Sequence, residues 1–404
     1  MPRMPGRSLF AFACLLLLSG IPTGCAQITP DKSTEPAIRG DALSLPASAP
    51  YTLLLEACEP TGSPPPAFSD FQDCYSHQLE QILVTQGATL SMLTLYQLAE
   101  ASKRFGNLCH ATAHHISEIM FERVGSVTEA MALCREGCAY GCQHAVLTAY
   151  LRSLPSGAQP DLERLCPQNP QHLFSLSHSH CIHGIGHGLA HYLDDIQLAL
   201  AVCDKFSLAW EQHFCAKGVF MEHSNKVALT QPPSKDHDRH LSLCRTMKSR
   251  VRNVCYYYLI QLVTLAGDGT TRSMFAACKN VPTANRGSCF LGIGRSLANE
   301  YIEREDDLIR LCRTQEEEDA ASCLLGFAGV VASFVDVDRG FRFCARLPEN
   351  VRIRCTRDVG IAVRLHWAAE DRITSECRKA RAARYVDACL GVYLPSGELA
   401  TQVP

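Results

Sequence analysis

The sequence has little net charge and lacks the short motifs of several common kinds of site. Its 404 residues carry a formal net charge of −3, so it has no basic excess of the kind that binds nucleic acid. It has no CxxC pairs of a zinc ribbon, no HExxH motif of a zinc protease and no CxxCH motif for c-type haem. A G-x-S-x-G nucleophile elbow and a phosphate-binding glycine loop are also missing. These absences exclude those classes of site and leave other metal and binding functions open.

The first 26 residues have the features of an export signal. Two arginines precede the apolar stretch from Leu9 to Leu18, which is too short to span a bilayer and typical of a signal peptide. Two kinds of processing fit: cleavage after Ala26, or lipid attachment at Cys25 within the lipobox-like sequence PTGC. We therefore expect an exported protein that is periplasmic, secreted, or held at a membrane by a lipid on Cys25. No transmembrane helix is expected after this segment.

The rest of the chain divides by composition. Residues 27–66 are rich in Pro, Ser and Thr, which predicts a linker. From residue 67 to 395 the sequence is apolar and helix-forming, and residues 396–404 form a C-terminal tail. Of the 16 histidines, 15 lie in the first half of this repeat domain, residues 67–240. The second half, residues 241–395, is poor in histidine, so any use of imidazole is expected in the first half.

The cysteines indicate a disulfide framework. Twenty of the 22 lie after Cys25, and an even number in an exported protein implies pairing. Seven pairs recur in register, and the second cysteine of each pair begins an apolar run 32 to 40 residues after the previous one. The predicted disulfides are Cys166–Cys181, Cys203–Cys215, Cys244–Cys255, Cys278–Cys289, Cys312–Cys323, Cys344–Cys355 and Cys377–Cys389.

Each cysteine pair marks a helical hairpin. A short helix carries the first cysteine near its end, a polar loop follows, and a longer helix carries the second cysteine in its first turns. Apolar residues recur three and four apart, which is the helical period. We predict an all-α fold: a right-handed superhelix (solenoid) of disulfide-linked helical hairpins with a ~34-residue repeat. Over about residues 67–395 this resembles tetratricopeptide and Sel1-like repeats in architecture only, and the resemblance implies a concave face that binds a protein or peptide.

Glycine recurs three residues after the cysteine that opens the second helix. Because glycine costs about 1 kcal/mol in a helix interior relative to alanine, repetition at one position predicts close approach between neighbouring helices. The glycines at this position are Gly141, Gly184, Gly218, Gly292 and Gly326.

The cysteines at the front of the repeat domain are less regular. Cys58 and Cys74 are expected to pair with each other. For the remaining four, the pairing that we predict is Cys109–Cys142 with Cys134–Cys138. The sequence alone does not fix this choice.

Histidine recurs at one position of the hairpins. Counting six residues from Cys109, Cys138 and Cys181 gives His115, His144 and His187, and the next unit has Met221 followed by Glu222 and His223. Equivalent positions in stacked hairpins line one face, so these imidazoles could converge on a transition metal ion, with Zn and Cu the best suited. The candidate ligands are His114, His115, His144, His183, His187, Glu222 and His223.

A packing role would produce the same histidine pattern. Duplication of one hairpin would repeat an imidazole that fills a groove and bonds to the next helix. The histidines of the segment SHSH, His178 and His180, are expected in a loop and outside the site.

Two functions follow from the sequence. The first is an exported helical-repeat binding protein whose groove holds a protein or peptide, with a histidine-lined metal site on the concave face. The alternative is an extracytoplasmic metal-dependent enzyme, hydrolytic or redox, that uses the histidine cluster. Neither requires a nucleic acid, and a membrane would be contacted only through a lipid on Cys25.

Overall fold

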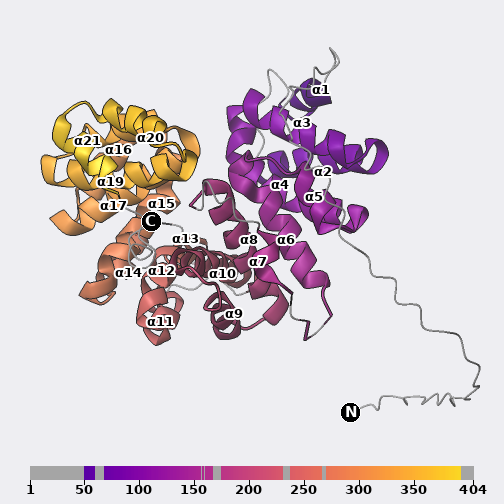
Figure 1. The fold of residues 1–404 in the computed structure, drawn as a ribbon, viewed down its shortest axis with the longest axis horizontal. Helices are drawn as coiled ribbons and strands as arrows, with labels where there is room; N and C mark the ends of the chain where they lie inside the picture. The colour runs from indigo at the N-terminus through magenta and orange to yellow at the C-terminus, as the bar shows by residue number, and fades with distance from the viewer. Residues whose placement is uncertain are drawn as a thin grey trace, which may run out of the picture. The chain divides into compact units, whose positions relative to one another are not determined.

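The structure is a computed structural model, and most of the residues that it describes are helical. They are residues 50–59, 68–155, 157–158, 160–166, 174–230, 237–265 and 270–392. Within these ranges there is no strand, so the all-α prediction is confirmed for them (Figure 1). The predicted signal peptide, the candidate lipidation site Cys25 and the C-terminal tail lie outside the described residues.

Short and long helices alternate along the chain. Before the regular repeat lie α1 (Pro50–Cys58), α2 (Phe68–Gln86) and α3 (Ala88–Ala101). The first helices of the hairpins are α5 (Val127–Leu133), α7 (Leu162–Leu165), α9 (Ile196–Cys203), α11 (His237–Thr246), α14 (Thr271–Lys279), α16 (Glu305–Cys312), α18 (Val337–Cys344) and α20 (Glu370–Cys377). The second helices are α4 (Lys103–Val124), α6 (Gly141–Ser153), α8 (Leu176–Leu193), α10 (Ala209–Thr230), α12 (Ser249–Leu259), α15 (Thr283–Tyr301), α17 (Glu317–Val330), α19 (Glu349–His366) and α21 (Ala383–Leu390). Between them lie η1 (Cys138–Tyr140), α13 (Gln261–Leu265), η2 (Val331–Val335) and η3 (Arg378–Ala380).

The starts of several helices follow from their capping residues. Ser126, Ser175 and Thr270 each accept a hydrogen bond through the side-chain oxygen from the backbone N–H three residues later. Such a cap satisfies one of the N–H groups that a helix start leaves without an intrahelical partner. Helix α4 ends at Gly125, whose φ of 70° is the left-handed conformation that glycine adopts readily.

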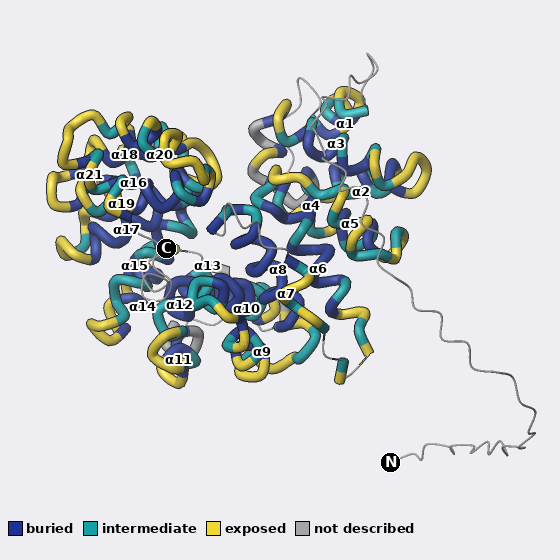
Figure 2. The backbone as a smooth tube through the Cα atoms, viewed as in Figure 1, coloured by how far each residue is buried: buried dark blue, intermediate teal, exposed yellow. Residues whose placement is uncertain are grey.

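The second helices form a continuous row. In chain order α4 contacts α6, α6 contacts α8, and the row continues through α10, α12, α15, α17, α19 and α21. From α9 onward each first helix packs against the second helix of its own hairpin. Figure 2 shows α8 and α10 buried over much of their length, whereas α9 and α11 expose one face. The described hairpins therefore stack in sequence, as a repeat requires.

All seven predicted disulfides are present. In most hairpins they join the last residue or turn of the first helix to the first turns of the second, with Cα–Cα distances such as 5.6 Å for Cys203–Cys215. The expected Cys58–Cys74 disulfide also forms. It ties α1 to α2, so the segment predicted as a linker at residues 27–66 contains a helix at its end.

The predicted pairing of the other four cysteines is wrong. The structure pairs Cys109 with Cys138 and Cys134 with Cys142. Cys134 follows α5 directly and Cys142 lies in the first turn of α6, so this pair is the hairpin disulfide of its unit. Cys138 lies in the turn η1 before α6, where it faces α4. The helix-opening cysteine of this unit is thus Cys142 and not Cys138.

The recurring glycines permit close helix contact, as predicted. A Cβ atom on Gly218 would lie 2.0 Å from the carbonyl oxygen of His183, and one on Gly326 would lie 2.0 Å from that of Leu291. The remaining glycines of the series, Gly141, Gly184 and Gly292, are also too close to a neighbouring helix for a Cβ without movement. Neighbouring second helices therefore approach backbone to backbone.

One helical stretch, Glu317–Val335, is long and apolar enough to cross a membrane, so the sequence expectation of no such stretch was wrong by that criterion. Most of it is buried inside the fold, and α17 packs between α15 and α19. Its apolar character therefore accords with a core helix.

Candidate metal centre

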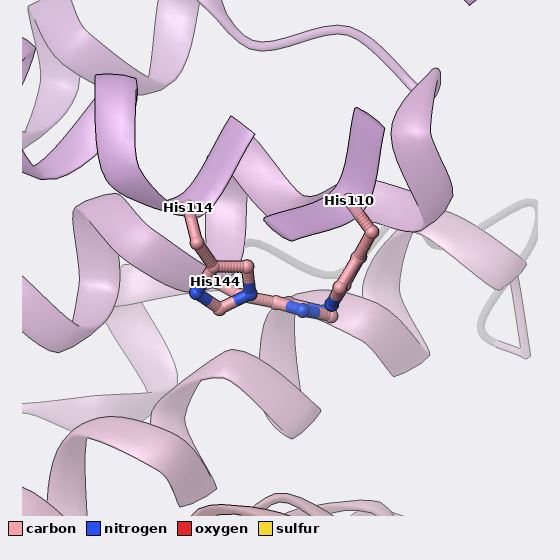
Figure 3. A group of neighbouring side chains, drawn as sticks. All are labelled: His110, His114 and His144. Atoms are coloured by element: carbon pink, nitrogen blue, oxygen red, sulfur yellow. The ribbon is translucent and has the colours of Figure 1, made fainter. Parts of the chain in front are cut away.

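Five imidazoles gather where α4, α6 and α8 meet. Neighbouring ring centres among them lie between 4.7 and 5.7 Å apart. Figure 3 shows the rings of His110 and His114, both from α4, reaching toward His144 of α6. His183 and His187 come from α8 and are one helical turn apart, so both face α6. The close stacking that Gly184 allows between α8 and α6 brings these rings into contact.

The cluster contains two groups that could each hold a metal ion. In one, ring nitrogens of His110, His114 and His144 lie within 4.8 Å of one another, and in the other those of His144, His183 and His187 do. We call these the first and the second triad. His144 belongs to both, and its side chain is almost fully buried.

Glu222 of α10 orients His187 in the second triad. Its Oε2 lies 2.8 Å from Nδ1 of His187, and because an ionised carboxylate can only accept, Nδ1 carries the proton. The other nitrogen, Nε2, is then unprotonated and lies 3.2 Å from Nε2 of His183, from which it accepts a hydrogen bond when His183 carries its proton there. Burial alone would raise the pKa of Glu222, but hydrogen bonds from His187 and His191 outweigh it and lower that pKa. A carboxylate behind an imidazole is a common second shell of metal sites.

A backbone carbonyl orients His110 in the first triad. Nδ1 of His110 lies 2.9 Å from the carbonyl oxygen of Cys138, which can only accept, so Nδ1 donates and Nε2 keeps a lone pair. Residues 138–140 all have positive φ, an uncommon conformation for residues other than glycine. The Cys109–Cys138 disulfide holds this turn against α4, beside the imidazole.

Two further ring nitrogens are buried without a hydrogen-bond partner. They are Nε2 of His114 and Nδ1 of His144. A buried polar atom normally has a partner, and leaving one unsatisfied costs about 1–3 kcal/mol. Both atoms belong to triad residues, although Nδ1 of His178, outside the triads, and side-chain atoms elsewhere in the described residues are in the same state.

Burial keeps several imidazoles of the cluster neutral. It lowers the pKa of His114, His144 and His183 well below the ordinary value of 6.5, and neighbouring imidazoles lower them further. The same causes lower the pKa of His180 to about 3. At neutral pH these side chains are therefore unprotonated, which is the form that binds a metal ion.

The structure brings together most, but not all, of the predicted ligands. His114, His144, His183 and His187 join the triads, and Glu222 contacts the cluster through His187. His115 does not join them, because it lies about 100° around the helix from His114. Its side chain is half exposed, and its Nε2 lies 3.7 Å from a carboxylate oxygen of Glu80. His223 is displaced from Glu222 in the same way, and neither triad includes it.

The sequence analysis missed one histidine of the site and misplaced two histidines that lie near it. His110 was not predicted, although it precedes His114 by the same four residues that separate His183 from His187. His178 and His180 were expected in a loop, but the Ser175 cap starts α8 at Leu176, so both are helical and buried. Nδ1 of His180 lies 3.2 Å from Nε2 of His144. His178 instead pairs with Glu211, at 3.0 Å.

The cluster opens onto a cavity of about 520 Å³. His110, His144, His180 and His183 form part of its wall, together with residues of α10, α12, α15 and α19. A small molecule in this space would reach the imidazoles, which gives the site access from outside.

The metal-free protein is expected to lose stability as pH falls below 6.5. The pKa of four imidazoles (His114, His144, His180 and His183) is lower in the folded chain than the unfolded value of 6.5. Between the two values only the unfolded chain takes up protons, so acid favours unfolding, by up to about 1.4 kcal/mol per pH unit for each group. His191 and Asp358, whose pKa values are raised in the folded chain, oppose this effect, but they are two groups against four. Urea unfolding of chelator-treated protein at pH 7.5, 6.0 and 5.0 measures the effect, and an unchanged midpoint would contradict it.

No family model matches the sequence, and no curated protein and no solved structure matches the chain. The predicted likeness to tetratricopeptide and Sel1-like repeats therefore holds for the helical, disulfide-linked architecture alone and assigns no family. What the site can do follows from its own side chains: neutral, oriented imidazoles around a reachable space.

Proposed function

We propose that this protein is an exported, disulfide-linked helical-repeat protein that binds a transition metal ion in its histidine cluster. The observation that carries the proposal is the convergence of buried, neutral imidazoles in two triads that share His144. Desolvated imidazoles packed this closely, with one ring nitrogen of His114 and one of His144 lacking a hydrogen-bond partner, are costly to assemble unless an acceptor of nitrogen lone pairs is bound. A metal ion is such an acceptor.

The spacing of the nitrogens supports metal binding over simple packing. Two nitrogens bound to one tetrahedral Zn²⁺ at about 2.05 Å are about 3.3 Å apart. The Nε2 atoms of His183 and His187 are separated by 3.2 Å. If the imidazoles only filled grooves, each would be expected to bond to a neighbouring helix, yet His114 and His144 each have a buried nitrogen without a partner.

The donor set favours zinc or copper. All six triad positions are supplied by imidazoles, which suit Zn, Cu, Fe and Ni, and the cysteines near the site are held in disulfides and cannot act as thiolate ligands. His110, His114 and His144 would hold an ion in the first triad, or His144, His183 and His187 in the second, because the neutral imidazole of His144 has one lone pair to offer. When bound, such an ion could act as a Lewis acid or redox centre.

Export and overall shape are parts of the same proposal. Ten disulfides support folding in an oxidising compartment outside the cytoplasm, and the signal-like N-terminus would direct the chain there. The sequential stacking of hairpins supports the right-handed superhelix, whose groove would hold a protein or peptide ligand.

The cavity favours a second candidate function, a metal-dependent enzyme. A surface that only stored an ion would not need a space of about 520 Å³ beside four imidazoles. This space is of the size that small-molecule sites have in proteins. A hydrolytic or a redox reaction of a small substrate at the ion would use it.

Metal analysis tests the proposal. Protein purified without a histidine tag and dialysed is expected to retain at least one Zn or Cu ion per chain by mass spectrometry. Because both triads include His144, the variant His144→Ala should lower metal content by more than about tenfold. The matched control is His115→Ala, on α4 beside His114 but outside both triads. Trace metal in the wild type, or full content in His144→Ala, would refute metal binding.

A further inference from the structure

Two basic side chains share the cavity with the histidines. Lys217 from α10 and Arg295 from α15 both line it. Lys217 is only 4% exposed, although lysine is among the residues least often buried. Burial, and then the charge of Arg295, lower the pKa of Lys217 to about 7. Lys217 is therefore only partly protonated at neutral pH, and an anion bound beside it would favour its charged form.

These cations occupy the repeat positions that carry imidazoles in α8. Lys217 follows its helix-opening Cys215 by two residues, as His183 follows Cys181. Arg295 follows Cys289 by six residues, as His187 follows Cys181. The wall formed by the second helices therefore changes from imidazoles to cations along one continuous surface of the repeat.

The cations are set among aromatic rings. The Arg295 guanidinium carbon lies 4.4 Å from the ring centre of Tyr258, and the Lys217 ammonium lies 4.5 Å from that of Phe214. The Tyr258 ring is in turn 6.2 Å from that of His183, so it spans the distance between the cations and the imidazoles. Such rings favour the packing of a flat apolar group.

Arg295 still has hydrogen-bonding capacity. One terminal nitrogen of its guanidinium donates to Gln261 at 2.8 Å, and Nε is buried without a partner. A carboxylate accepts from a guanidinium with two oxygens and would bind at the terminal nitrogens, because Nε itself is covered by the protein. Asp358 is the acidic residue of the cavity wall, but burial raises its pKa to about 7, so it does not hold a full counter-charge there.

We propose that the cavity binds a small aromatic carboxylate whose acid group lies between Lys217 and Arg295 and whose ring packs against Tyr258. The end of the molecule away from the acid group would then face the imidazoles. As the substrate class of a metal-dependent reaction this assignment rests on the proposed metal site, whereas binding of the anion depends on the cations alone.

Binding of 4-fluorobenzoate to the full exported chain, followed by fluorine NMR, tests the proposal. The neutral isostere 4-fluorobenzamide should bind at least about tenfold more weakly, a difference of about 1.4 kcal/mol. Arg295→Gln and Lys217→Met should each weaken benzoate binding by a similar factor. The matched control is Lys226→Met, which removes an exposed lysine from the same helix as Lys217 and should leave the affinity unchanged.

Equal affinity for the acid and the amide overturns the proposal, as does unchanged benzoate binding in a folded Arg295→Gln variant. That variant decides the matter if Lys217→Met fails to fold, and melting curves of both variants show whether they are folded. Titrations with chelator and with added Zn²⁺ separate the two hypotheses. Selective anion binding by a chain that holds no metal supports this proposal and refutes the metal site, and metal binding without selectivity does the reverse.

Discussion

Reduction of the disulfides is expected to abolish stable folding of this protein at physiological temperature. Each hairpin disulfide closes a short loop, of 11 residues in four of the hairpins, and such a bond contributes about 2–4 kcal/mol. Ten such bonds together exceed the 5–15 kcal/mol by which proteins are usually stable. The first helices α9, α16, α18 and α20 have eight residues each, too few to persist alone in water.

Thermal unfolding followed by circular dichroism measures this effect. Many of the cysteines are fully buried, for example Cys278 and Cys289, so the protein should be reduced in denaturant and then returned to buffer with reductant. The control is the oxidised protein taken through the same steps. A variant that lacks one bond, Cys312→Ala with Cys323→Ala, should lose about 2–4 kcal/mol and remain folded. A reduced chain that melts cooperatively within a few degrees of the oxidised one would contradict the prediction.

The variant Gly294→Ala is expected to destabilise the protein by about 3 kcal/mol or more. A Cβ atom at this position would lie 1.9 Å from the carbonyl oxygen of Cys323, which belongs to the backbone of the next second helix, α17. A rigid helix backbone cannot turn aside as a side chain can, so α15 and α17 would have to separate. The separation would open the core that both helices share.

Gly287→Ala is the matched control because it lies on the same helix, α15. There the nearest atom to an added Cβ is the side-chain oxygen of Ser322, at 3.3 Å. Alanine is favoured over glycine in a helix by about 1 kcal/mol, so this change should be neutral or stabilising. Urea unfolding of both variants gives the comparison. Equal midpoints would show that close helix contact at Gly294 does not limit stability.

Most of the fold follows from the sequence because its signals are local and repeated. The cysteine pairs, the helical period and the glycine three residues after several of the opening cysteines all act within one hairpin or between neighbours. A disulfide such as Cys344–Cys355 is fixed by short-range geometry, so its register is visible in the sequence. Because the same cysteine pattern occurs in seven hairpins, each hairpin supports the prediction made for the others.

The front of the domain could not be predicted in this way. Cys109 was treated as a helix-opening cysteine because it lies six residues into α4, as Cys215 does in α10, but its partner is Cys138 of the turn η1 and not a cysteine of a first helix. Counting six residues from it selected the exposed His115, and the helix in fact turns His110 and His114 toward α6. The left-handed turn at residues 138–140 sets the Cys109–Cys138 pairing. It contains no glycine, the residue from which such a turn can be predicted in a sequence.

The contents of the cavity wall also depend on tertiary structure. His180 was assigned to a loop because SHSH looks polar, and only the packing of α8 against α6 shows that it meets His144. Lys217 and Arg295 are separated by 78 positions (295 − 217) and lie on non-adjacent second helices. No local sequence pattern relates the two residues to each other. Each does occupy a position, counted from its helix-opening cysteine, at which α8 carries a histidine.

The Cys109–Cys138 bond links the histidine cluster to the order of events after synthesis. Until these two sulfurs are joined, nothing covalent holds the carbonyl of Cys138 against His110. A newly made chain in a reducing cytosol would lack this support, so the first triad should be completed only after translocation and oxidation. If the chain is exported as proposed, ion loading of the first triad would then occur outside the cytosol, from whatever metal that compartment supplies.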